Sequence, residues 1–136
     1  DVQIRITNDP DLNLVARKIA PVRRIICATP QYFQQWGIPQ TPQDLTKHNC
    51  LDCSLSHERG YWRFNGPEGN IKIPISGTLR INDNDALAQA AIYGLGIAML
   101  PTYTIDMELR AGRLQAVFPG IVCAHPLRPH EPFVVA

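Results

Sequence analysis

Two cysteines and two histidines that lie close together in the sequence are the first candidates for chemistry. Cys50 and Cys53 are separated by two residues, and His48 and His57 flank them. Thiolate sulfur and imidazole nitrogen are ligands that zinc prefers. However, the stretch CLDCS predicts a strand, in which side chains three positions apart point to opposite faces, whereas a redox CxxC pair would open a helix. Zinc or redox chemistry stays an alternative, but the strand favours free, buried thiols and no metal.

The other motifs do not make a reaction centre. Gly94-x-Gly96 lacks the third glycine of a dinucleotide fingerprint and follows a helix, where that motif should precede one. Asp83 and Asp85 could be paired carboxylates for acid–base catalysis, yet capping of a helix explains both. The sequence contains no phosphate-binding loop and no Gly-x-Ser-x-Gly elbow. We therefore predict a protein that is not an enzyme and needs no cofactor.

Composition indicates a globular protein rather than a nucleic-acid or membrane module. The 136 residues are 45% hydrophobic and 18% charged, with a formal net charge of +1. A domain that itself binds DNA usually has a clear basic excess. No apolar run approaches the ~20 residues that span a bilayer. Four cysteines without a secretory signal favour a reducing compartment, so we expect a cytoplasmic protein.

The stretch NDNDALAQAAIYGLGIAMLP, residues 82–101, predicts a helix, a glycine turn and a buried strand. Its first four side chains can accept hydrogen bonds from the helix start, and Asn82 and Asp85 have the spacing of a capping box. Gly94 and Gly96 predict the helix end, since glycine adopts the left-handed conformation without steric penalty. The preceding strand, TLRIN, completes a β-α-β crossover, which builds parallel sheets.

Strands and short helices alternate along the rest of the chain, which predicts an α/β protein with a mixed sheet. The predicted strands are residues 2–7, 14–20, 22–28, CLDCS, YWRFN, NIKIPISG, 114–118 and 133–135; the predicted helices are PQYFQQWG, TPQDLTKH and residues 103–110; the Pro-rich segment 119–132 is predicted to be a loop.

Four basic residues cluster around a proline between two of these strands. Arg17, Lys18, Arg23 and Arg24 surround Pro21. They could bind an anion, or they could be solvated charges at a strand edge, which the alternation of strand side chains favours.

Strand-like residues stand near both ends of the chain. DVQIRIT alternates apolar and polar side chains, and Phe133–Val135 lie one residue before the end. Strands at both ends would leave open, unpaired edges, which proteins normally avoid. We therefore expect the chain to be cut from something longer.

Several motifs follow one another along the chain: DVQIRI, LVARKIAPVRRIICATPQYF, a Thr-Pro-x-Asp-Leu helix start before His48, Trp62-x-Phe64, the run Gly77, Leu79, Asn82 and Asp83, the segment Gly94–Pro101, Gly112-Arg113-Leu114 and the segment Pro132–Val135. No single motif is specific, but the ordered set covers essentially the whole chain. The set resembles the effector-binding domain of LysR-type transcriptional regulators.

The resemblance implies an α/β protein with the two-lobed, Rossmann-like fold of type II periplasmic-binding proteins, its first lobe incomplete. Residues 1–20 and 119–136 would be the remnant of the first lobe, and residues 21–118 the second lobe. The winged helix-turn-helix, its linker helix and the first β-α-β part of lobe one would lie outside this chain.

The function that the resemblance implies is ligand sensing. A small-molecule effector would bind in the cleft between the lobes and modulate DNA binding, which would occur only through the absent helix-turn-helix domain. A homo-oligomer with no membrane contact is expected. The alternative is a free-standing solute-binding protein of the periplasmic type, which the free cysteines and the lack of an export signal disfavour.

The expected effector-binding residues lie where strands end and helices begin. Ligands of doubly wound sheets sit beyond the carboxyl ends of strands, near the backbone N–H groups of helix starts. Arg5 could pair with the carboxylate of an anionic effector or be an outward strand charge, and Asp83 and Asp85 would repel an anion unless they point away. The expected residues are Arg5, Ile6, Thr7 and Asn8 after the first strand, Ser54 after CLDCS, and Asn82, Asp83 and Asn84 at the helix start.

Overall fold

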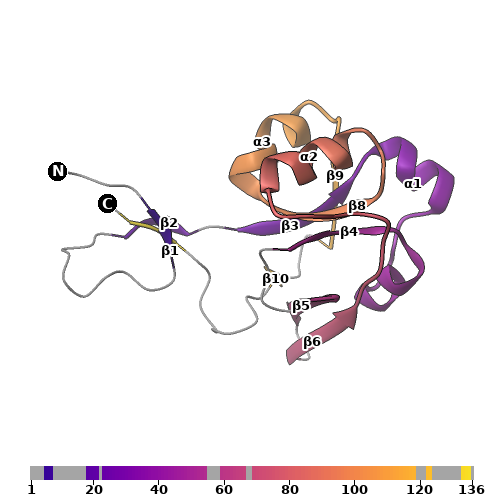
Figure 1. Ribbon diagram of the computed structural model, residues 1–136, viewed down its shortest axis with the longest axis horizontal. Helices are drawn as coiled ribbons and strands as arrows, with labels where there is room; N and C mark the ends of the chain where they lie inside the picture. The colour runs from indigo at the N-terminus through magenta and orange to yellow at the C-terminus, as the bar shows by residue number, and fades with distance from the viewer. Residues whose placement is uncertain are drawn as a thin grey trace.

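A computed structural model (Figure 1) describes most of the chain. The described residues are 5–7, 18–21, 23–54, 59–66, 69–118, 122–123 and 133–135. Side chains are described within 23–54, 59–66 and 69–118.

Five strands form a mixed central sheet with the order β7-β4-β8-β3-β9. β4 runs parallel to both β7 and β8, whereas β3 is antiparallel to both β8 and β9. The predicted α/β class with a mixed sheet is confirmed. The strands are β7 (Arg80–Ile81), β4 (Cys50–Cys53), β8 (Ile97–Pro101), β3 (Arg24–Ala28) and β9 (Gln115–Val117).

The described part of the chain contains three α-helices and one 3₁₀ helix: α1 (Pro30–Trp36), η1 (Pro42–Lys47), α2 (Asn84–Ile92) and α3 (Thr102–Arg110). Thr29 caps α1, because its hydroxyl oxygen accepts the Tyr32 N–H at 3.1 Å. Gly37 ends α1 with a φ of 85°, as the sequence predicts. The segment TPQDLTKH is helical but takes the tighter 3₁₀ form.

Apolar side chains bury both faces of the central sheet. On one face, Leu87 and Ala91 of α2 pack against Leu51 of β4 and Leu100 of β8. On the other face lies the hairpin of β5 (Tyr61–Gly66) and β6 (Gly69–Pro74), whose Phe64 is fully buried. Figure 1 shows these layers, with α2 and α3 above the sheet and β5 and β6 below it.

The Pro-rich segment after residue 118 contains a short strand that the sequence analysis missed. β10 (Val122–Cys123) pairs antiparallel with β5, with Val122 opposite Asn65 and Cys123 opposite Phe64. The prediction of a loop throughout 119–132 is therefore wrong at these two residues. A free edge of β5 offers backbone hydrogen bonds to any extended segment that reaches it, and a two-residue strand has no periodicity of its own to detect.

The two ends of the chain pair with each other in a separate sheet of three antiparallel strands. β11 (Phe133–Val135) lies between β1 (Arg5–Thr7) and β2 (Lys18–Pro21). The registers place Thr7 and Pro21 opposite Phe133. The predicted strands at both ends are confirmed, but the expectation of open edges is wrong for β11, since both of its edges are paired. The division into lobes at residues 20 and 119 stays a prediction.

Candidate functional site

Two of the predicted site segments meet at one edge of the central sheet. Because β4 and β7 are parallel, their carboxyl ends lie side by side, and the Ser54 N–H donates to the Ile81 carbonyl at 2.8 Å. The thiol of Cys53 lies 3.7 Å from Oδ1 of Asn84, the first residue of α2. The structure therefore brings Ser54 together with the helix start. Ser54 and Asn84 are half-buried, and Asn82 and Asp83 are exposed.

Asp83 is the residue that caps α2. Its carboxylate accepts the Asp85 N–H at 3.0 Å, and its carbonyl accepts the Leu87 N–H at 3.0 Å. The expected Asn82–Asp85 capping box is thus wrong, because the cap lies one residue later. The carboxylate of Asp83 also occupies the positive end of the helix, where an anionic ligand would otherwise be favoured.

Asn82 and Asp83 are expected to contribute differently to the free energy of unfolding, because only Asp83 caps α2. Asp83→Ala should lower the free energy of unfolding by about 1 kcal/mol, because it removes the acceptor of the Asp85 N–H. Asn82→Ala, the matched control, should change it by less than about 0.5 kcal/mol, the usual range for exposed positions. Urea unfolding followed by circular dichroism measures both. Equal losses would show that the cap is not the one described.

The other predicted site residues lie at the start of the chain. Arg5, Ile6 and Thr7 form β1, which pairs with β11 in the three-stranded sheet and not with the central sheet. Their side chains and all of Asn8 lie outside the described part of the structure. The placement of these four residues beside an effector stays a prediction.

A buried carboxylate next to Ser54, paired with an exposed arginine, was missed by the sequence analysis. Asp52 is 8% exposed, and its Oδ2 lies 3.5 Å from Nη2 of Arg80, the residue opposite it on β7. Its Oδ1 is buried without a hydrogen-bond partner. The detectable signal was a carboxylate inside the apolar strand CLDCS with an arginine in the neighbouring strand TLRIN. The pair joins the two strands whose ends carry Ser54 and Asn82.

The cysteines do not assemble a metal site in the part of the chain that the structure describes. Cys50 packs with Trp62 and Phe64, whereas Cys53 packs against the opposite cluster under α2, so their predicted opposed directions are confirmed. Burial raises the pKa of the Cys50 thiol to about 12, which keeps it protonated. Among the described residues, no three His, Cys, Asp or Glu side chains gather closely enough to hold a metal ion. His57 lies outside them.

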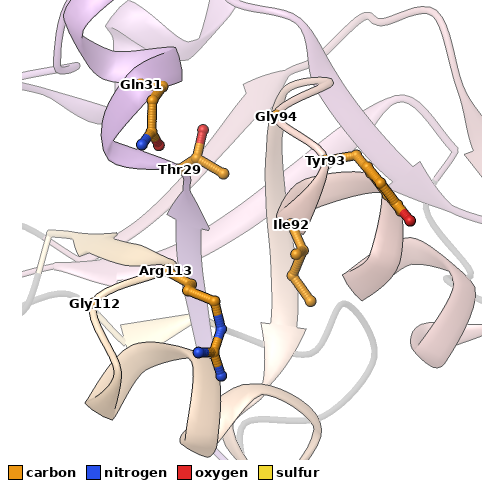
Figure 2. A pocket seen from close by; sticks show the side chains of 7 residues that line it. All are labelled: Thr29, Gln31, Ile92, Tyr93, Gly94, Gly112 and Arg113. Atoms are coloured by element: carbon orange, nitrogen blue, oxygen red, sulfur yellow. The ribbon is translucent and has the colours of Figure 1, made fainter.

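A groove of about 410 Å³ opens beyond the amino-terminal end of β8, at the end of the sheet opposite to Ser54 (Figure 2). Thr29 and Gln31 come from the start of α1, Tyr93 and Gly94 from the end of α2, and Arg113 from the turn after α3. Two of its polar groups have structural roles: Thr29 caps α1, and the Arg113 guanidinium pairs with Glu108. The groove is therefore distinct from the Ser54 edge and does not coincide with any predicted site residue.

The structure describes part of the basic cluster around Pro21, and it describes the helices that could be tested as membrane spans. Within the basic cluster, Arg23 is exposed and Arg24 half-buried, while the side chains of Arg17 and Lys18 are not among those described. None of the helices in the described ranges is long and apolar enough to cross a membrane.

Comparison with known proteins relates the chain to transcriptional regulators. Residues 1–131 match the LysR substrate binding domain family. The chain is 34% identical over 120 residues to the HTH-type transcriptional regulator DmlR of Escherichia coli K12, covering 88% of this chain and 39% of that protein. It is 33% identical over 119 residues to the probable HTH-type transcriptional regulator LtrA of Klebsiella pneumoniae, covering 88% and 38%. The chain thus spans about two fifths of the length of these relatives.

Solved structures of such regulators share the fold. Full-length AphB, a virulence activator of Vibrio cholerae and a member of the LTTR family, superposes with a TM-score of 0.80 at 22% identity, covering 97% of this chain and 42% of AphB. The regulatory domain of AphB from Vibrio vulnificus superposes with a TM-score of 0.76 at 25% identity, covering 97% of this chain and 63% of that domain. The fold is that of type II periplasmic-binding proteins, and the chain belongs to the LysR substrate-binding domain family.

Proposed function

We propose that this chain is the effector-sensing part of a LysR-type transcriptional regulator. The match of residues 1–131 to the LysR substrate binding domain family carries this proposal. Relatives named as HTH-type transcriptional regulators support it. A small molecule binds between two lobes, residues 21–118 on one side and residues 1–20 and 119–136 on the other. DNA is bound through a helix-turn-helix domain outside this chain.

The effector contacts come from both lobes. Ser54, Asn82 and Asn84 supply hydroxyl and amide groups at the carboxyl ends of β4 and β7, the usual ligand edge of such sheets. In this proposal, the contacts of the first lobe would come from Arg5, Ile6, Thr7 and Asn8. Asp83 accepts a hydrogen bond from the helix start, so an anionic group of the effector is bound by Arg5 and not by α2.

The remaining parts of the proposal follow from the family. The protein senses and does not catalyse, acts in the cytoplasm as a homo-oligomer and has no membrane contact. The alternative of a free-standing solute-binding protein is not favoured, because the relatives that this chain matches are transcriptional regulators.

A ligand screen on the intact regulator tests the site. The melting temperature is measured with a panel of small carboxylates, amino acids, sugars and aromatic acids, since a ligand at 100 times its Kd stabilises a protein by about 2.7 kcal/mol. For a compound that raises the melting temperature, Ser54→Ala and Asn84→Ala should weaken binding at least about tenfold by calorimetry, the equivalent of one or two hydrogen bonds.

The control variant for this screen is Asn65→Ala, which removes an exposed amide on β5. It should leave the affinity unchanged. Tight binding that is insensitive to both Ser54 and Asn84 would place the effector elsewhere, and a compound that binds while DNA affinity stays constant would contradict effector sensing.

A further inference from the structure

A partly buried hydrogen-bond chain links α1, the end of η1 and the start of β4. The Asn49 N–H donates to the Tyr32 hydroxyl oxygen at 3.3 Å, and that oxygen lies 2.9 Å from Nδ1 of His48. Because the oxygen already accepts the Asn49 N–H, its own proton is free to point at Nδ1. In the neutral imidazole with its proton on Nε2, His48 accepts the hydrogen bond of the Tyr32 hydroxyl through Nδ1.

Asn49 extends this chain into two loops. Its side-chain amide donates to the Leu95 carbonyl at 2.7 Å and to the Thr78 hydroxyl at 3.0 Å, while its Oδ1 accepts the Thr78 N–H at 2.8 Å. Its backbone carbonyl accepts the Ile97 N–H at 2.9 Å. Thr78 precedes β7 and Leu95 precedes β8, the two strands that flank α2 in the sequence. Asn49 thus holds both loops at the amino-terminal edge of β4.

The surroundings of His48 favour its neutral form. Burial lowers the pKa of His48 below its ordinary value of 6.5, and the carboxylate of Asp44 on η1 opposes this only in part. Lys47 is the adjacent cation on η1. Tyr32 on α1 and Cys50 on β4 are neutral, because burial raises the pKa values of both side chains. β6 also packs against η1 and carries the cation Lys72, whose ammonium lies over the Tyr61 ring.

We propose that His48 is a proton-operated latch, in which protonation of Nδ1 reverses its hydrogen bond with Tyr32, leaves the Tyr32 hydroxyl proton without its acceptor, and so loosens the Asn49 contacts that hold the loops before β7 and β8. Once Nδ1 carries a proton, it can no longer accept, and the Tyr32 hydroxyl has to turn its own proton away from His48. Tyr32 is 6% exposed, so water does not readily replace the lost acceptor. The bond from Asn49 to Tyr32 is disturbed in the same step.

The direction of the pH effect follows from linkage. A folded-state pKa below the unfolded value means that the neutral form is stabilised by folding. The stability that neutral His48 contributes to the folded state is fully present above about pH 6.5. It is lost as the pH falls through the lowered pKa of His48. A regulator with this latch would respond to acidification through its second lobe without any effector. The latch does not depend on where the effector binds.

Amide hydrogen exchange on the 136-residue chain tests the latch. Protection factors of the Thr78 and Ile97 amides, both held by Asn49, should fall by up to about tenfold per pH unit below pH 6.5. Amides of β3 serve as the internal reference. In His48→Gln, whose amide oxygen can accept from Tyr32 without titrating, the same two protection factors should not change with pH. Equal acid sensitivity in both proteins would overturn the proposal and would assign the effect to another of the four histidines.

A second measurement requires no stable variant at residue 48. The imidazole of His48, titrated by NMR in the unmodified chain, should have a pKa below 6.5. In Tyr32→Phe, which keeps the ring and removes the donor hydroxyl, that pKa should rise. A value at or above 6.5 in the unmodified chain, or the same value in Tyr32→Phe, would overturn the latch.

Discussion

Replacing Gly96 with alanine is expected to lower the free energy of unfolding by about 3 kcal/mol, at the upper end of the range for overpacking. Gly96 is buried in front of β8, and a Cβ there would collide with the Asn49 carbonyl oxygen. It would also lie 3.2 Å from Asn49 Nδ2 and from Leu51 Cδ2. The backbone cannot give way without breaking the hydrogen bond from the Ile97 N–H to the same carbonyl.

The control for this substitution is Gly66→Ala on β5. Neither Gly66 nor Gly96 has a positive φ, so the two differ in space and not in backbone strain. A Cβ at Gly66 would meet only Ile71 Cδ1 at 3.8 Å and the Gly69 carbonyl oxygen at 4.0 Å. We expect a change of less than about 1 kcal/mol there. Urea midpoints that differ by less than the error between the two variants would refute the close approach.

The helices α1 and α2 were predictable because the residues at their ends have a recognisable role in starting or ending a helix. Thr29 and Gly37 bound α1, and Gly94 has the φ of 81° that the end of α2 requires. Gly96 was predicted for the wrong reason, since what requires glycine there is the carbonyl of Asn49 and not a left-handed backbone. That carbonyl is far away in the sequence, so no local pattern could have indicated it. The same holds for β10, which exists only because β5 lies beside it.

The candidate site was predictable in part. The rule that ligands lie beyond the carboxyl ends of parallel strands placed Ser54 near Asn82, and the pairing of β4 with β7 brings them together. The cap was misplaced by one residue, because Asn82, Asp83, Asn84 and Asp85 are all competent to cap a helix. The network of Tyr32, His48 and Asn49 joins α1 to the start of β4, and no sequence pattern indicated that these three residues contact one another.

Asn49→Ala is expected to lower the free energy of unfolding by about 2 kcal/mol. Each lost hydrogen bond contributes about 1 kcal/mol, and because Thr78 is exposed, water compensates for part of the hydrogen bonding that Thr78 loses. The substitution removes both donors to Thr78 and Leu95 and the acceptor of the Thr78 N–H. Asn65→Ala, at an exposed position on β5, should change the stability by less than about 0.5 kcal/mol. Urea unfolding at pH 7.5 compares the two, and a loss below about 1 kcal/mol at Asn49 would refute its role in holding the loops.

Combining Asn49→Ala with His48→Gln shows whether the two residues act as one unit. Residues that share a hydrogen-bond network have non-additive effects, whereas independent sites add within about 0.5 kcal/mol. If His48 acts on Thr78 through the Asn49 side chain, the acid sensitivity of the Thr78 amide should already be absent in Asn49→Ala alone, because that amide donates to Asn49 Oδ1. The Ile97 amide donates to the backbone carbonyl of residue 49, which the substitution keeps, so its acid sensitivity should remain. Acid sensitivity of the Thr78 amide that persists in Asn49→Ala would mean that His48 reaches this loop by another route, and would separate the latch from the asparagine side chain.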